Sequence, residues 1–317
     1  MNEFNTEMTL LSSTTVDIPK QCIIHCHALN YSYYIFPALP IAANLSNVIL
    51  GTGGVLENAS DVDTFGCRFV LVPRGDKRSE TGRFEGEIDC DLGGRNGYIY
   101  HIIRVDEESS LGGDEIHISL VAYCSHLNSE LMASQFHLKP DMKITADDGD
   151  LRRFHIRVRR ADSLSAGKVS VTSELLWSCR GGATDLNCVS PCERYCYMVS
   201  NYRDPHALPP DMDAFVATLR HSRIHKFDLV ARLMENFITA CTDKRSSPAL
   251  ISYVDVPGMI LRQPVCMPSE TGQHRIVCLG YPRVTYDETK LVVADGQLQE
   301  LTAVGLEKKV GYCNHNG

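Results

Sequence analysis

The chain has 317 residues, of which 44% are hydrophobic, and its 31 basic and 39 acidic residues give a formal net charge of −8. This hydrophobic content excludes a disordered protein, and the length suffices for one large domain or two ordinary ones. The acidic balance argues against a protein built wholly around nucleic acid, while leaving room for a local basic surface.

The N-terminal part of the chain carries no pattern of an export signal. The first twenty residues lack a basic start and a continuous apolar run. The most apolar early stretch, residues 33–50, contains Pro37, Pro40 and two asparagines, so it does not read as a membrane span. The thirteen cysteines are an odd number and cannot all pair internally. Together these features predict reduced thiols in a cytoplasmic, reducing compartment, or within a particle assembled there.

Most of the chain predicts β-strands. Residues 1–18 are polar and aperiodic, which is typical of an N-terminal arm. After them, runs rich in β-branched and aromatic residues alternate with turn residues. Asn-Gly or Asp-Gly steps at residues 96–97, 148–149 and 295–296 favour hairpins, because these pairs adopt positive φ with little strain. The predicted strands are residues 67–72, 84–90, 97–105, 115–124, 142–145, 151–160, 168–179, 291–294 and 297–301.

One segment follows a helical period instead. Pro209 and Pro210 precede a run in which hydrophobic residues recur at intervals of three, four or eight between Phe215 and Phe237. An aspartate just after the prolines can cap the free amides of the first turn. The pattern predicts one long helix over about residues 211–241.

These elements predict an α+β, β-dominated fold. Strands that follow one another through hairpin turns favour an antiparallel β-sandwich or jelly-roll-like body, with the long helix attached. The predicted division is an arm over residues 1–18, a β-rich domain over residues 19–205, and residues 206–317 as the helix plus short strands packed on the same body. The boundary falls where turn-forming residues cluster, at residues 201–210.

No catalytic motif stands out. Gly167 and Lys168 resemble the end of a phosphate-binding loop, but Asp162 replaces its first glycine and Val169 its magnesium ligand. The chain has no Gly-x-Ser-x-Gly elbow and no His-Glu-x-x-His pair.

A cysteine cluster is the best metal candidate. Four thiolates and a histidine near one another suit a structural zinc ion, although the spacing differs from common zinc knuckles. If residues 190–197 form a helix, two of the cysteines share one face. The alternative is a set of buried thiols beside a loop. The candidate ligands are Cys179, Cys188, Cys192, Cys196 and His206.

Two histidine groups are weaker metal candidates. In an extended segment His25 and His27 share one side and Cys26 takes the other, which an ordinary strand with one polar face explains better than a metal site. His221 and His225 lie four residues apart in the predicted helix. Arg220, Arg223 and Lys226 surround them, which favours a solvated basic face over metal binding.

The clearest electrostatic feature is a strand with one basic side. In residues 151–160, Phe154, Ile156 and Val158 face one way, and a row of cations faces the other. Such a row needs acidic neighbours, which favours this chain's own carboxylates or another subunit over nucleic acid, since no aromatic side chains interleave the cations. The candidate partner-binding residues are Arg153, His155, Arg157 and Arg159 on this strand, with Arg220, Arg223 and Lys226 on the predicted helix.

The sequence therefore favours a structural or assembly protein over an enzyme. The predicted role is a subunit of a large particle, such as a viral capsid, coat or clamp protein, that acts through self-association or a larger protein assembly. Two alternatives remain open. One is an enzyme whose site is assembled from dispersed His, Cys and acidic residues, and the other is a zinc-stabilised binding module. No cofactor other than zinc is indicated.

Overall fold

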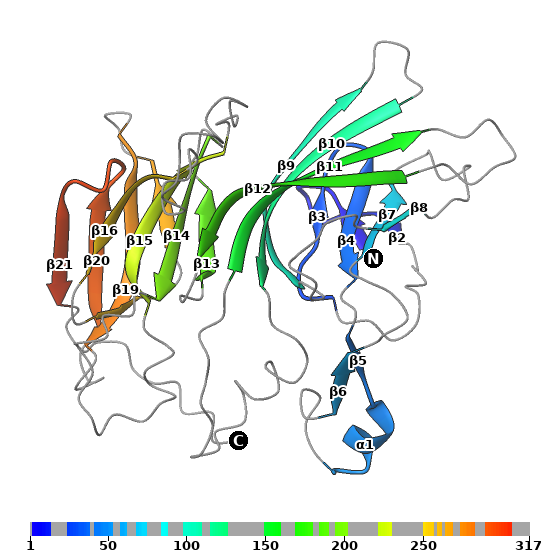
Figure 1. Ribbon diagram of the computed structural model, residues 1–317, viewed down its shortest axis with the longest axis horizontal. Helices are drawn as coiled ribbons and strands as arrows, with labels where there is room; N and C mark the ends of the chain where they lie inside the picture. Colours follow the sequence, from blue (N-terminus) through cyan, green and yellow to red (C-terminus); the bar gives the residue numbers. More distant parts are fainter. Residues whose placement is uncertain are drawn as a thin grey trace, which may run out of the picture. The chain divides into compact units, whose positions relative to one another are not determined.

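The computed structural model describes residues 2–13, 24–38, 41–52, 58–61, 68–74, 84–87, 98–109, 115–125, 149–159, 169–179, 184–189, 194–201, 221–229, 250–256, 259–261, 264–268, 273–282 and 289–305. Two compact units can be distinguished, of which unit 1 holds strands β1 to β12 and unit 2 holds strands β13 to β21 (Figure 1). Every strand pairing among the described residues is antiparallel. The predicted β-dominated, antiparallel character is therefore confirmed.

The described part of unit 1 contains two four-stranded sheets, ordered β3-β4-β7-β8 and β12-β11-β10-β9, and the two small pairs β1-β2 and β5-β6. Its elements are β1 (Asn2–Phe4), β2 (Leu10–Ser13), β3 (Ala28–Leu29), β4 (Tyr33–Ala38), β5 (Ile41–Ala43), α1 (Leu45–Ile49), β6 (Ala59–Asp61), β7 (Arg68–Pro73), β8 (Phe84–Glu87), β9 (Tyr98–Ser109), β10 (Glu115–Ser125), β11 (Gly149–Arg159) and β12 (Val169–Cys179).

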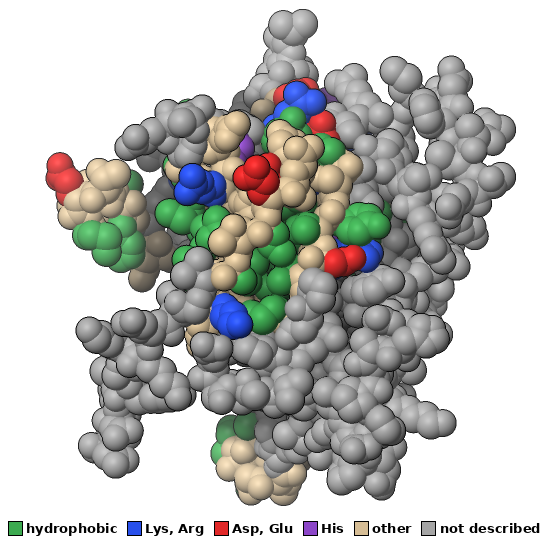
Figure 2. Space-filling model, turned by 90° about the vertical axis from the view of Figure 1, so that its left-hand side faces the viewer, with side chains coloured by type: hydrophobic (Ala, Val, Ile, Leu, Met, Phe, Trp, Pro, Cys, Tyr) green, Lys and Arg blue, Asp and Glu red, His purple; other side chains and the backbone are tan. Residues whose placement is uncertain are grey.

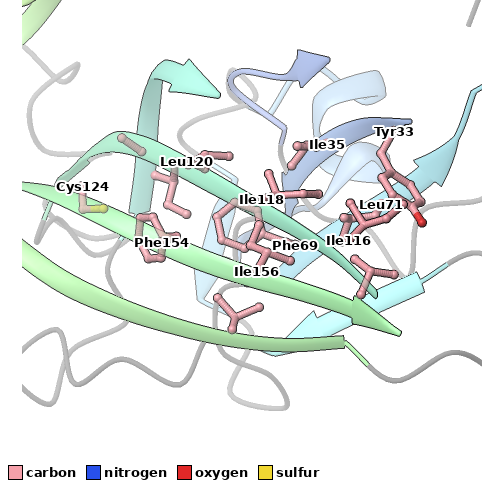
Figure 3. Packing of buried hydrophobic residues seen from close by; sticks show 14 residues of the cluster. Tyr33, Ile35, Phe69, Leu71, Ile116, Ile118, Leu120, Cys124, Phe154 and Ile156 are labelled. Atoms are coloured by element: carbon pink, nitrogen blue, oxygen red, sulfur yellow. The ribbon is translucent and has the colours of Figure 1, made fainter. Parts of the chain in front are cut away.

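The core of unit 1 lies between its two four-stranded sheets. The alternation predicted for residues 151–160 is confirmed, since Phe154, Ile156 and Val158 of β11 are fully buried. Their side chains pack with residues of β4, β7 and β10 in one hydrophobic cluster (Figure 3). The rings of Phe69 and Phe154 meet edge to face, with centroids 5.4 Å apart. The alternation of polar and apolar residues along β11 therefore determines which of its faces packs against the core.

Unit 2 contains one sheet ordered β13-β14-β15-β16 and another ordered β17-β19-β20-β21, in which β18 also pairs with β19. The two sheets share a core, to which Tyr197 and Ile224 contribute from the first sheet and Ile276 and Val292 from the second. The strands are β13 (Thr184–Val189), β14 (Tyr195–Asn201), β15 (His221–Asp228), β16 (Leu250–Asp255), β17 (Met259–Leu261), β18 (Val265–Met267), β19 (Arg275–Pro282), β20 (Lys290–Asp295) and β21 (Leu301–Gly305).

The sheet of β17 to β21 is apolar on its second face as well. The register aligns Val265, Val277 and Val293 in one row across three strands. Val265 is 55% exposed and Leu279 is 41% exposed. Figure 2, which faces the side of Figure 1 where β20 and β21 lie, shows hydrophobic side chains gathered there beside a few charged ones.

The jelly-roll part of the prediction is wrong. In a jelly roll or Greek key, sheets combine strands that are distant in the sequence. Here β9 to β12 and β13 to β16 each form a sheet of strands that follow one another along the chain. The architecture is thus a series of antiparallel meanders.

The predicted long helix is also wrong where the structure describes it. Residues His221–Asp228 form strand β15, and residues 211–220 and 230–241 lie outside the described residues. β15 pairs with β14 on one side and β16 on the other. Ile224, His225, Lys226 and Phe227 are all buried, so both faces of the strand are covered. A strand that is buried on both faces shows no alternation of polar and apolar residues. The sequence therefore lacks the pattern that distinguishes a strand from a helix.

Several individual strand predictions can be checked. Those at residues 67–72, 115–124 and 168–179 are confirmed by β7, β10 and β12. A hairpin follows residues 291–294 as predicted, but its second strand is β21 at Leu301–Gly305 and not residues 297–301. The hairpin predicted across residues 84–105 is wrong, because β8 pairs with β7 and β9 pairs with β10. Residues 142–145, and residues 202–210 of the predicted domain boundary, lie outside the described residues.

Candidate functional site

Two histidines from separate parts of unit 1 meet beside strand β9. His25 lies in the extended segment before β3, and His101 lies in β9. Their rings are edge to face, with centroids 5.5 Å apart and an interplanar angle of 70°. Two imidazoles bound to one ion at about 2.1 Å would have ring centres roughly 5 Å apart, so this spacing suits a shared metal.

The local sequence explains why His25 is presented at the surface. Cys26 and Ala28 pack against the hydrophobic core of unit 1, so the residues that alternate with them, His25 and His27, turn outward. His25 and His27 are exposed, and the ring of His27 stacks on that of Phe36 with centroids 6.1 Å apart. The predicted alternation along this segment is therefore confirmed.

Cys26 is not a reactive thiolate. Burial raises the pKa of its thiol to about 11, so it stays protonated near neutral pH. Its Sγ lies 3.8 Å from the carbonyl oxygen of Ile99 in β9, to which it donates a weak hydrogen bond. Cys26 thus attaches the segment to β9, next to the two histidines.

A second polar contact joins the same segment to β9. The Ser32 amide donates to Oε2 of Glu107 at 3.0 Å, and the Ser32 hydroxyl donates to Oε1 at 2.5 Å. Asn30 shapes the turn before β4, because its Oδ1 accepts the amides of Ser32 and Tyr33 at 3.1 and 2.7 Å. Glu107 therefore holds a turn that is already organised.

Among the described residues, His25 and His101 are a candidate pair of metal ligands. No group of three or more His, Cys, Asp or Glu side chains comes together within the described ranges. A pair of imidazoles can hold a divalent ion weakly by itself and leaves further coordination positions for other ligands, water or substrate.

The cysteine cluster remains a prediction. Cys192 and His206 lie outside the described residues. Cys179 and Cys188 lie in β12 and β13, and Cys196 is buried in β14, where it pairs with Val189. The helix considered for residues 190–197 is wrong from Tyr195 onward, because β14 begins there.

The basic row on β11 meets acidic groups of neighbouring strands. Arg153 is nearly buried, and its Nη1 lies 2.6 Å from Oε1 of Glu174 in β12. His155 lies 3.8 Å from the same oxygen, and Nε of Arg159 lies 3.5 Å from Oε1 of Glu115 in β10. Arg157 is exposed, opposite His117 in the register. Whether this row also contacts a partner stays a prediction.

The second basic group lies on strand β15 and not on a helix. Arg223 binds both carboxylate oxygens of Asp255, at 2.6 and 2.9 Å. Its guanidinium also stacks on Tyr253, with Cζ 4.1 Å from the centroid of the ring. Lys226 is 2% exposed, and its Nζ lies 3.0 Å from Oε1 of Gln297. Arg220 lies outside the described residues. The solvated helical face expected for this group is therefore wrong at Lys226.

Sequence reasoning missed His101 and undervalued His25. The two residues are far apart in the chain and belong to no short motif, so only the packing of the segment before β3 along β9 brings them together. The available signal was one histidine within the apolar run at residues 98–103, and many ordinary strands carry such a residue.

Residues 1–316 match the family model RPE65, described as retinal pigment epithelial membrane protein. No curated protein sequence matches the chain. Among solved structures, Synechocystis apocarotenoid oxygenase matches with a TM-score of 0.62 at 19% identity, and its cobalt-substituted form with 0.61 at 19%. A chimera of this oxygenase with RPE65 matches with 0.63 at 18%. Each match covers 96% of this chain and 55% of the other, so the chain spans about half the length of these structures.

These matches correct the predicted function. A capsid, coat or clamp subunit is wrong, since the whole chain fits a family and a fold that include an oxygenase. The meander sheets are those of β-propeller-like oxygenases and not of a jelly roll. The cobalt-substituted form shows that the Synechocystis oxygenase holds a metal ion. Within the described residues, no helix has the length and apolarity needed to cross a bilayer.

Proposed function

Because this chain belongs to the retinal pigment epithelial membrane protein family, we propose that it acts in a metal-dependent enzyme of the apocarotenoid-oxygenase type. The proposed substrate class is a long apolar polyene, and the proposed reaction is oxidative cleavage. This is the dispersed-site enzyme that sequence reasoning ranked second.

The observation that carries the proposal is the meeting of His25 and His101. Imidazole is the commonest protein ligand for a catalytic transition metal, and the distance between the two ring centroids is compatible with one shared ion. When bound, a divalent ion would supply the Lewis-acid or redox chemistry that an oxygenase needs.

In this proposal, the residues of the chain bind the metal ion and hold its ligands in place. His25 and His101 would each present one neutral ring nitrogen to the ion. Cys26 keeps its proton and its place against the core, so it would neither compete as a thiolate ligand nor react with an oxidant as readily as a low-pKa thiol. Among the described residues, this arrangement favours imidazole ligands over thiolate ligands for the metal ion.

The proposal can be tested by Co²⁺ titration of the full 317-residue chain, followed by visible absorption spectroscopy. We expect His25→Ala and His101→Ala each to lower Co²⁺ affinity about tenfold or more and to change the spectrum. His117→Ala is the matched control, because His117 is a partly exposed histidine on β10 that pairs with Glu115 at 3.3 Å. Single alanine variants of the remaining histidines would identify further ligands.

Activity is measured separately, as loss of polyene absorbance when the metal-loaded chain is given an apocarotenoid and oxygen. We expect cleavage that both histidine variants abolish and the His117 control retains. Unchanged Co²⁺ binding in both His25→Ala and His101→Ala would remove the basis of the proposal.

A further inference from the structure

We propose that the second face of the β17 to β21 sheet binds the same face of another copy of this chain, so that two molecules pair about a two-fold axis. This pairing goes beyond the metal centre and does not depend on it. The core of unit 2 takes Ile276, Cys278, Val292 and Ala294 from β19 and β20. The residues that alternate with them along the two strands therefore point to the opposite face of the sheet.

This second face has an apolar centre. Its apolar side chains come from β18, β19 and β20, and all of them are exposed or partly exposed: Val265, Met267, Val277, Leu279, Leu291 and Val293. Figure 2 shows hydrophobic side chains gathered on this side of the molecule. A contiguous apolar patch on a folded surface is typical of a region that another molecule covers.

The register of β19 and β20 makes the face complementary to itself. Its successive rows pair Leu279 with Leu291, Val277 with Val293, and Arg275 with Asp295. A two-fold axis that runs between β19 and β20, parallel to both, lays β19 of one copy over β20 of the other. Each residue then faces its own row partner in the second copy, so leucine meets leucine, valine meets valine and arginine meets aspartate. Two aligned, twisted sheets pack in this way at roughly 30° to each other.

The charged row favours a second copy over a wholly apolar partner. Arg275 is exposed at the start of β19. Oδ1 of Asp295 accepts the amides of Gln299 and Glu300, at 2.6 and 3.0 Å, which holds this carboxylate at the end of β20. The two-fold axis brings Arg275 of each copy to Asp295 of the other, and this contact occurs twice. An apolar partner would instead remove water from both charges without compensating them.

The size of the face predicts a weak dimer. The sheet is four strands wide along the path β17-β19-β20-β21, and β20 has 6 residues. At about 4.8 Å between strands and about 3.4 Å per residue, such a face covers about 400 Å². A standard interface buries about 800 Å² on each partner, so we expect a dissociation constant of roughly 10 to 100 µM. In dilute solution the monomer then predominates, with this face accessible.

The dimer can be measured by sedimentation velocity of the full 317-residue chain at concentrations on both sides of this constant. We expect a shift from monomer to dimer as the concentration rises, with or without Co²⁺. Leu279→Lys places a lysine of each copy within the apolar contact and should weaken the dimer about tenfold or more. Ile251→Lys is the matched control, because Ile251 is 47% exposed on β16, in the other sheet of unit 2, and Leu279 is 41% exposed.

Charge reversal tests the orientation of the two copies. Arg275→Glu and Asp295→Lys each set like charges against each other at both contacts, so each variant alone should dimerise several-fold more weakly than the wild type. Mixing the two variants places opposite charges at both contacts again and should restore the dimer. Thermal unfolding is measured for each variant, because Asp295→Lys also removes an acceptor of two amides. If that variant does not fold, Leu279→Lys and Arg275→Glu decide the matter.

The outcomes separate this pairing from the proposed function. A dimer that Leu279→Lys weakens, that Ile251→Lys leaves intact and that the mixed charge variants restore supports the pairing. A chain that stays monomeric at every concentration overturns it, and so does a dimer that Leu279→Lys and Arg275→Glu both leave unchanged. His25→Ala should dimerise as the wild type does, so loss of the metal centre and loss of the dimer are observed independently.

Discussion

The two units place their charged and apolar side chains in opposite ways. In unit 1, the sheet of β9 to β12 buries an apolar face and turns Arg153, His155, Arg157 and Arg159 outward, where carboxylates of neighbouring strands meet three of them. In unit 2, β15 buries His225 and Lys226, while the sheet of β17 to β21 exposes apolar side chains such as Val265 and Met267. Two units that are both built from antiparallel sheets can therefore differ in what the second face of a sheet carries.

The difference follows from how the strands are covered. β11 is covered mainly on one face, so its sequence alternates, and His155, Arg157 and Arg159 remain exposed to water. β15 is covered on both faces, so its polar side chains must find hydrogen-bond or charge partners inside the unit. Lys226 does so through Gln297 and the ring of Tyr195, whose centroid lies 4.3 Å from Nζ.

The largest effect should come from breaking the buried face of unit 1. Phe154→Ala removes a ring that is fully buried against Phe69, and we expect the free energy of unfolding to fall by about 3 to 5 kcal/mol. Chemical denaturation followed by circular dichroism measures it. Arg157→Ala, on the exposed face of the same strand, should change stability by at most about 0.5 kcal/mol. Equal losses in the two variants would contradict the one-sided burial of β11.

Acid should act on unit 2 through His225. The pKa of the His225 imidazole is lowered from 6.5 to about 3. Burial is the main cause and the charge of Arg223 adds to it, while Asp255 acts in the opposite direction. Below pH 6.5 the unfolded chain takes up a proton that the folded chain does not bind until about pH 3. Stability is therefore fully present above pH 6.5 and falls as the pH is lowered, by up to roughly 1.4 kcal/mol per pH unit.

The variant that checks this is His225→Phe, which cannot titrate, with stability measured at several pH values between 7 and 4. We expect its pH dependence to be shallower than that of the wild type. His155→Gln is the control from unit 1, because His155 is exposed on β11. A wild-type slope in His225→Phe would mean that this histidine does not carry the acid sensitivity.

How far the sequence could be interpreted also differs between the units. Alternation in residues 151–160 sufficed to predict the strand, its inward residues and its outward cations. For residues 221–228 the same reasoning predicted a helix, because a strand covered on both faces has no alternation and its apolar residues can fall at helical intervals by chance.

The candidate site was hidden for a different reason. The spacing between His25 and His101 is set by the way a short segment lies along β9, through contacts such as that of Ser32 with Glu107. Such contacts depend on tertiary packing and leave no local pattern. The outward orientation of His25 could be predicted, but its neighbour could not.

A smaller effect should distinguish the ion pairs on the outer face of unit 1. Glu174→Ala leaves the nearly buried Arg153 without this partner, and we expect a loss of about 1 to 3 kcal/mol. Glu115→Ala removes a partner of Arg159, whose side chain is 73% exposed, and should cost at most about 1 kcal/mol. Urea unfolding at low and high salt measures both. A Glu174→Ala loss no larger than that of Glu115→Ala would show that the burial of Arg153 does not strengthen its pair.

The smallest change in stability should come from giving the exposed face of the β17 to β21 sheet in unit 2 the polar character of the outer face of β11 in unit 1. The same change should clearly reduce the apolar area of that surface. Leu279→Lys combined with Val265→Thr replaces exposed apolar side chains of the β17 to β21 sheet by polar ones, at a cost of about 0.5 kcal/mol or less. We expect less binding of a dye such as anilinonaphthalene sulfonate, because the contiguous apolar area that the dye recognises is interrupted. The reverse change in unit 1, Arg157→Leu, should raise dye binding only slightly, since the polar residues opposite it, His117 and Ser170, keep the new apolar side chain isolated. Dye binding that is unchanged by the double substitution would show that the apolar face of this sheet is not accessible in solution.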